Sequence, residues 1–189
     1  MTPAWKRDLE LTEVRWHGRG GQGAVLGATI LGTAAAIYEG KHALSFPSFG
    51  AERRGAPVLA FNRIAARPIR DRSMVYHPTV LLVLDDSLLG VVKVAEGAVD
   101  GADVLVNTRK SASQLGLSDW LRVHVLDATS IAKEVLGVPI VNTAMLGALA
   151  AATGLIGIES LVRAIGDVLP PRLVERNLAA AKAAYEAMR

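Results

Sequence analysis

Apolar and polar positions divide the chain into short strands and longer helices. Residues 11–17 alternate around Leu11, Val14 and Trp16, which is typical of a strand with one buried face. The run 79–84 is aliphatic almost throughout, as expected for a strand buried on both faces of a parallel sheet. Further strands of the same style are predicted over residues 103–107 and 122–126, and shorter alternating runs over residues 43–46 and 58–64.

Helices are predicted between and after these strands. Residues 22–39 form a long segment that is apolar nearly all round and ends at Gly40, a plausible C-cap. Four more helices are predicted over residues 129–136, 144–153, 158–169 and 172–188. We therefore expect one α/β domain spanning residues 1–189: a Rossmann-like three-layer fold with C-terminal helices and a mostly parallel, mixed sheet. Its antiparallel part is expected near residues 43–64.

A glycine-rich turn joins the first strand to the first helix. Gly18, Gly20 and Gly23 match the pattern G-x-G-x-x-G, in which glycines permit a tight turn and close approach of a ligand to the backbone. The amides at the start of the following helix would face an anion. The candidate binding residues of this turn are Gly18, Arg19, Gly20, Gly21, Gln22 and Gly23. The alternative is that the glycines only let the helix pack closely on the sheet.

A dinucleotide site also needs a ribose-binding carboxylate about 20 residues beyond the glycines. Residues 44–49 contain no acid, which weakens an NAD site. The adjacent Arg53 and Arg54 leave an NADP site open, since paired guanidiniums suit phosphate or carboxylate recognition. They are equally consistent with ion pairs to a partner subunit or with simple solvation.

Composition narrows the functional classes. The 189 residues carry 21 basic and 18 acidic side chains, a net charge of +3 with no lysine-rich arm, so no nucleic-acid partner is expected. The 51% hydrophobic content indicates surface that is buried against other chains. Because cysteine is absent, this chain supplies no disulfide, thiolate ligand or cysteine nucleophile. No apolar run approaches the ~18 residues of a membrane span, and we expect a cytoplasmic protein.

No group of residues in the sequence assembles a catalytic or metal centre. The four histidines lack the spacing of a metal pair, and His17 is expected to be structural rather than a ligand donor. Asp85 and Asp86 follow a strand, where capping of the next turn by Asp86 or Ser87 is the better interpretation. We therefore predict that this chain has no catalytic and no metal-binding residue. It is expected to be one part of a larger catalyst.

Two motifs in this order resemble those of one family. Residues 18–23 (GRGGQG), followed by residues 48–57 (SFGAERRGAP), are similar to the gamma subunit of the 2-oxoacid:ferredoxin oxidoreductases, of which pyruvate:ferredoxin oxidoreductase is the familiar member. The strand ending at Asp86 and the helix start at residues 142–148 also look like that family. The resemblance extends from about residue 12 to residue 180.

The resemblance implies a multisubunit enzyme. It would decarboxylate a 2-oxoacid oxidatively, join the acyl group to coenzyme A, and pass electrons to ferredoxin or to a flavin subunit. Thiamine diphosphate, Mg²⁺ and 4Fe–4S clusters would reside on partners: alpha and beta thiamine-binding subunits and a ferredoxin-like delta subunit. The glycine turn, Arg53 and Arg54 would face those partners, and would contact coenzyme A phosphates or brace a partner's loop. The alternatives are a stand-alone NAD(P)-dependent oxidoreductase and a non-enzymatic assembly module.

Overall fold

The computed structural model describes residues 11–48 and 54–189. In this part of the chain, strands form one six-stranded sheet in the order β2-β3-β1-β4-β5-β6. β1, β4, β5 and β6 are mutually parallel, whereas β3 runs antiparallel to both β1 and β2. The predicted mixed α/β sheet, with its antiparallel part near residues 43–64, is confirmed. The strands are β1 (Leu11–Arg19), β2 (His42–Pro47), β3 (Pro57–Ala65), β4 (Val80–Val83), β5 (Asp103–Asn107) and β6 (Arg122–Leu126).

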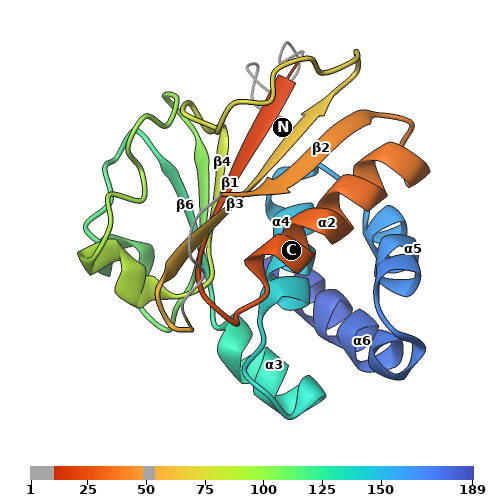
Figure 1. The fold of residues 1–189 in the computed structure, drawn as a ribbon. Coiled ribbons are helices and arrows are strands. Elements are labelled where there is room, and N and C mark those ends of the chain that lie inside the picture. Colours follow the sequence, from red (N-terminus) through yellow and green to blue (C-terminus); the bar gives the residue numbers. More distant parts are fainter. Residues whose placement is uncertain (1–10, 49–53) are drawn as a thin grey trace.

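The α-helices gather on one face of this sheet (Figure 1). They are α2 (Ala24–Thr33), which continues as a π-helical turn (Ala34–Tyr38), α3 (Ala128–Leu136), α4 (Asn142–Thr153), α5 (Ile158–Val168) and α6 (Pro171–Met188). The first helix begins at Ala24 rather than at residue 22, because Gly23 adopts a left-handed conformation with φ of 78°. No helix in the described ranges is both long and apolar enough to cross a membrane.

The opposite face of the sheet is covered by turns and a short 3-10 helix, η2 (Asp86–Gly90). A second apolar core lies beneath them, where Leu81 and Val83 of β4 meet Leu88 and Val94. The third layer of the fold therefore consists of the irregular segments that follow β4 and β5. Such segments leave the sheet less evenly covered than long helices would.

Close packing fixes α2 against the first strand. A Cβ atom on Gly27 would lie 2.8 Å from the ring of Trp16, so only glycine permits this approach. The indole Nε1 of Trp16 donates to Asn62 Oδ1 at 2.8 Å, and Asn62 Nδ2 donates to the carbonyl oxygen of Ala28 at 2.7 Å. Because Trp16 and Asn62 are fully buried, this network rigidly joins β1, β3 and α2 and so positions the turn between β1 and α2.

Candidate functional site

The glycine turn is held by hydrogen bonds of its own. Gln22 N donates to the carbonyl oxygen of Arg19 at 3.0 Å, and the Gln22 side chain folds back to accept from Arg19 N at 2.7 Å. Its Nε2 donates to Asp85 Oδ2 at 3.1 Å. The Gln22 side chain thus occupies donors and space that a bound pyrophosphate would use in a dinucleotide site.

Asp85 is the centre of this arrangement. Its Oδ2 also accepts from Arg19 Nε at 3.0 Å, while its Oδ1 accepts from Ser87 N at 3.0 Å and Ser87 Oγ at 2.6 Å. Desolvation acts against the charged carboxylate, but the hydrogen bonds from Ser87, Gln22 and Arg19 prevail and lower the pKa of Asp85. The prediction that Asp86 or Ser87 caps the turn after β4 was wrong, because the capping side chain is that of Asp85.

Arg19 is consequently occupied within the chain. Besides Asp85, its guanidinium donates to the carbonyl oxygen of Gly55 at 3.0 Å and to Ser87 Oγ at 2.7 Å. Arg19, one of the candidate binding residues of the turn, links β1, the 54–57 segment and the turn after β4 in this structure. Its role in this geometry is to position the glycine turn.

The structure brings the glycine turn and Arg54 together. Gly20 forms a parallel bridge with Arg54, Gly20 N donates to the carbonyl oxygen of Ala56 at 2.9 Å, and Gly55 N donates to the carbonyl oxygen of Gly20 at 3.1 Å. The Arg54 side chain is exposed, and no hydrogen bond or ion pair involves it within the described ranges. Arg53 lies outside the described residues. Backbone contacts therefore join the glycine turn directly to residues 54–56 of the second motif.

α4 reaches the same turn from the helical side. Asn142 Nδ2 donates to the carbonyl oxygen of Gly23 at 3.2 Å, and a Cβ atom on Gly23 would lie 2.5 Å from that nitrogen. The left-handed φ of 78° favours glycine at this position, and the missing side chain leaves room for the Asn142 amide. Gly23 therefore serves packing within the helical layer, whereas the alternative interpretation of the motif concerned packing of the first helix on the sheet.

A cavity of about 810 Å³ opens beside the turn, at the carboxyl ends of β4, β5 and β6. We call it the strand-end cavity. Its polar lining is Gly20, Gly21, Gln22, Arg54, Asp85, Asp86, Asn107, Thr108, Arg109, Lys110, Asp127, Thr129 and Lys133. Asp85, Asn107 and Asp127, at or just after the ends of β4, β5 and β6, all line it, at the edge where open parallel sheets usually bind ligands.

Charges of both signs surround the strand-end cavity. Arg109 pairs with Asp127 at 2.9 Å and Lys110 pairs with Asp86 at 3.2 Å, and both cations are largely exposed. Arg54 and Lys133 have no ion-pair partner among residues 11–48 and 54–189. These same ranges hold no cluster of three or more His, Asp or Glu side chains suited to a metal ion. The exposed cations of this arrangement can bind an anion.

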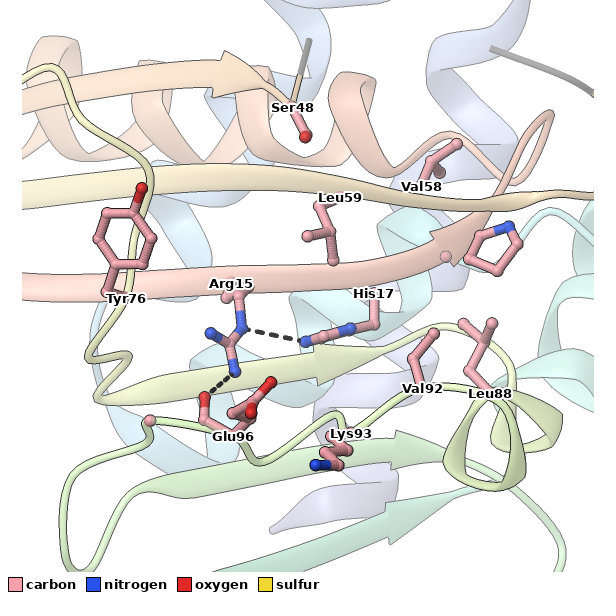
Figure 2. A pocket seen from close by; sticks show the side chains of 13 residues that line it. Arg15, His17, Ser48, Val58, Leu59, Tyr76, Leu88, Val92, Lys93 and Glu96 are labelled. Atoms are coloured by element: carbon pink, nitrogen blue, oxygen red, sulfur yellow. Dashed lines mark hydrogen bonds between the residues drawn. The ribbon is translucent and has the colours of Figure 1, made fainter. Parts of the chain in front are cut away.

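A second cavity, of about 610 Å³, lies on the opposite sheet face (Figure 2). We call it the sheet-face cavity. Its floor is made by Arg15 and His17, which project from the same side of β1 because they are two residues apart. Arg15 was not among the candidate residues predicted from the sequence; its only signal is that it lies two residues before His17, on the same face of a strand.

His17 is buried, as its expected structural role requires. Its Nε2 accepts from Arg15 Nε at 3.2 Å. Burial, and then the adjacent Arg15 guanidinium, lower the pKa of His17 to about 3. The imidazole is therefore neutral at physiological pH, and the ring proton resides on Nδ1.

The neutral His17 predicts a loss of stability in mild acid. An unfolded histidine takes up a proton near pH 6.5, whereas folded His17 resists protonation until about pH 3, so the free energy of unfolding falls as pH drops through this window. At pH 5 we expect a loss of about 2 kcal/mol from this group relative to pH 7. Urea unfolding of the chain and of His17→Phe between pH 7 and 5 checks this. An equal slope in both proteins would contradict it.

The fold and site define an open-sheet α/β protein with a cavity lined by charged residues at the carboxyl ends of its parallel strands. Residues 13–187 match the model of the pyruvate ferredoxin/flavodoxin oxidoreductase family. The common gamma subunit of the pyruvate/ketoisovalerate oxidoreductases of Pyrococcus furiosus is 51% identical, over 93% of this chain and 96% of that protein. The pyruvate synthase subunit PorC of Methanothermobacter marburgensis is 49% identical, over 95% and 98% of the two chains.

A solved structure agrees with these relatives. The pyruvate oxidoreductase subunit PORC of Thermotoga maritima superposes with a TM-score of 0.80 at 37% identity, covering 94% of this chain and 96% of that one. The chain belongs to the pyruvate ferredoxin/flavodoxin oxidoreductase family. It is a gamma subunit of a 2-oxoacid:ferredoxin oxidoreductase, and it works as one part of a multisubunit enzyme. The alternative of a stand-alone NAD(P)-dependent oxidoreductase is not supported.

Proposed function

We propose that this chain, acting as one unit over residues 1–189, presents its strand-end cavity to the thiamine-binding alpha and beta subunits. There it receives phosphate groups of coenzyme A during oxidative decarboxylation of a 2-oxoacid. The observation that carries the proposal is the direct backbone connection between Gly20 and Arg54 at the mouth of this cavity. It sets a free guanidinium beside the carboxyl ends of the parallel strands, the usual ligand edge of such sheets.

The charges around the cavity support an anionic ligand held at the surface. Arg54 and Lys133 have no ion-pair partner within the described ranges that a phosphate would have to displace. The exposed Arg109 and Lys110 can leave their carboxylate partners and bind phosphate instead, because exposed ion pairs contribute little free energy. Arg53, adjacent in sequence, is proposed to act with Arg54. We propose that Gly18, Arg19, Gly20, Gly21, Gln22 and Gly23 act on coenzyme A chiefly indirectly. The backbone of the turn and the side chains of Arg19 and Gln22 shape the surface that carries Arg54.

The enzyme class uses cofactors, and this chain's residues do not fit the redox groups among them. It has no cysteine to hold a 4Fe–4S cluster, and the described residues form no candidate metal cluster for the Mg²⁺ of thiamine diphosphate. We therefore propose that thiamine diphosphate, Mg²⁺ and the clusters are bound by the alpha, beta and delta subunits. Ferredoxin or a flavin subunit would accept the electrons. The proposed cytoplasmic location is testable by fractionating cells that contain the native complex.

Coenzyme A binding to the assembled enzyme tests the role of the arginines. Arg54→Ala and Arg53→Ala are each expected to weaken coenzyme A binding about tenfold, because each removes a charge-assisted hydrogen bond to phosphate. Isothermal titration measures this, with native mass spectrometry confirming that every variant still assembles. Arg70→Ala is the matched control, since Arg70 is an exposed arginine beyond the opposite end of β3. Unchanged affinity in both arginine variants would leave these residues as braces for a partner and overturn the coenzyme A proposal.

A further inference from the structure

The floor of the sheet-face cavity holds a buried positive charge. Arg15 is only 8% exposed, and no carboxylate lies within ion-pair distance of it among residues 11–48 and 54–189. Its guanidinium is held by backbone carbonyl oxygens of Val75 at 3.4 Å, Val94 at 2.9 Å and Glu96 at 2.6 Å. These neutral acceptors satisfy its hydrogen bonds but leave its charge unbalanced, so the cavity floor favours an anion.

His17 adds an unused donor at the same place. Its Nε2 accepts from Arg15, which puts the proton on Nδ1, and Nδ1 is buried without a hydrogen-bond partner in the described structure. His17 is 4% exposed and lines the cavity. A buried N–H without an acceptor is destabilising, and an acceptor supplied by a ligand would remove that penalty.

The walls of the cavity are apolar. Leu59 of β3 stands on one side, and Leu88 and Val92 of the segment after β4 stand on the other, with Lys93 at the rim (Figure 2). The carboxylate of Glu96, which also lines the cavity, acts on Arg15 electrostatically, but it is exposed to solvent that screens its charge. A small ligand with a compact hydrocarbon part and one anionic acceptor matches this combination.

We propose that the sheet-face cavity is a binding site for a small organic monocarboxylate. The carboxylate accepts from His17 Nδ1–H beside the Arg15 guanidinium, and a branched or ring-shaped hydrocarbon part packs between Leu59, Leu88 and Val92. The cavity lies on the sheet face opposite the helices, so this site does not depend on the proposed coenzyme A surface. This site would bind its ligand with residues of this subunit alone.

The test uses the full chain with its histidines labelled with ¹⁵N. The chain has four histidines, so the Nδ1 signal of His17 can be assigned by its absence from His17→Phe. Titration with 3-methylbutanoate is expected to shift this signal saturably below about 10 mM, a modest affinity suited to so small a ligand. The uncharged 3-methylbutanamide is expected to bind at least about tenfold more weakly, because it lacks the charge that faces Arg15.

Three variants separate binding from folding. His17→Phe removes the donor and is expected to lose at least about tenfold in affinity, while His17→Asn, whose amide nitrogen can stand near the Nδ1 position, should retain binding within about threefold. Val92→Trp fills the cavity from its wall without touching His17, and it should abolish the shift even if His17→Phe folds poorly. Absence of a saturable shift, equal binding of the amide, or undiminished binding to Val92→Trp would each overturn the proposal.

Discussion

Replacing Gly147 by alanine is expected to lower the free energy of unfolding by about 3 kcal/mol. Gly147 lies in the middle of α4, where that helix crosses α6. A Cβ atom there would overlap the carbonyl oxygen of Ala181 and lie 2.8 Å from its carbonyl carbon. Because this obstacle is backbone, no side-chain rotation relieves it, and the two helices have to separate. The usual gain from alanine in a helix, about 1 kcal/mol, is smaller than this cost.

Gly166 provides the matched control. It is exposed in α5, and a Cβ atom at this position would meet nothing within 4 Å. Gly166→Ala is therefore expected to stabilise the chain by about 0.5–1 kcal/mol, since only the helix preference remains. Urea unfolding of both variants measures the pair. Equal stability of Gly147→Ala and the parent chain would show that α4 and α6 do not approach as closely as described.

The contact at Gly147 also bears on the glycine turn. α4 begins at Asn142, whose side chain donates to the carbonyl oxygen of Gly23, and Thr143 donates to Asn177 Oδ1 of α6 at 2.8 Å. A displacement of α4 away from α6 would therefore move Asn142 relative to the turn. Packing in the helical layer and geometry at the strand-end cavity are thus mechanically connected.

The periodicity of apolar residues predicted most of the strands and helices, because this periodicity reflects which residues of each element are buried. The aliphatic runs at residues 79–84 and 103–107 became buried strands, and glycine or proline ended helices near the expected positions. The irregular layer on the opposite sheet face was harder to predict. The segments after β4 and β5 show no regular period of apolar residues that would indicate how they pack.

The contacts of the charged residues in both cavities were harder to predict, because their partners lie far away in the sequence. The glycine motif identified Arg19 as a candidate binding residue, but it could not indicate that Asp85, 66 residues later, pairs with it. Arg15 carried no motif at all, and its burial is explained only by carbonyl groups 60 to 81 residues away. A sequence pattern indicates which residues are polar, whereas the long-range fold decides which of them are already occupied.

Asp85 is the residue whose loss should most disturb the glycine turn. Asp85→Ala removes the acceptor of four hydrogen bonds, from Arg19, Gln22 and the amide and hydroxyl of Ser87. Hydrogen bonds to charged groups contribute about 1.5–3 kcal/mol each but do not add fully, so we expect a loss of about 3 kcal/mol in the free energy of unfolding. Arg19 would then lie beside the turn without its counter-charge. Urea unfolding gives the stability, and amide hydrogen exchange at residues 20–22 reports loosening of the turn.

Asp86→Ala separates this effect from a general loss of negative charge. Asp86 is the next residue, and its carboxylate accepts from Thr108 Oγ1 at 2.8 Å and pairs with the exposed Lys110 at 3.2 Å. Its removal leaves the glycine turn intact and is expected to cost only about 1 kcal/mol. Asp85→Asn should fall between the two alanine variants, because its oxygen still accepts from Ser87 while its NH₂ group opposes the donors of Arg19 and Gln22. If Asp85→Ala were no more destabilising than Asp86→Ala, and exchange at the turn were unchanged, the turn would be held by the glycine backbone alone.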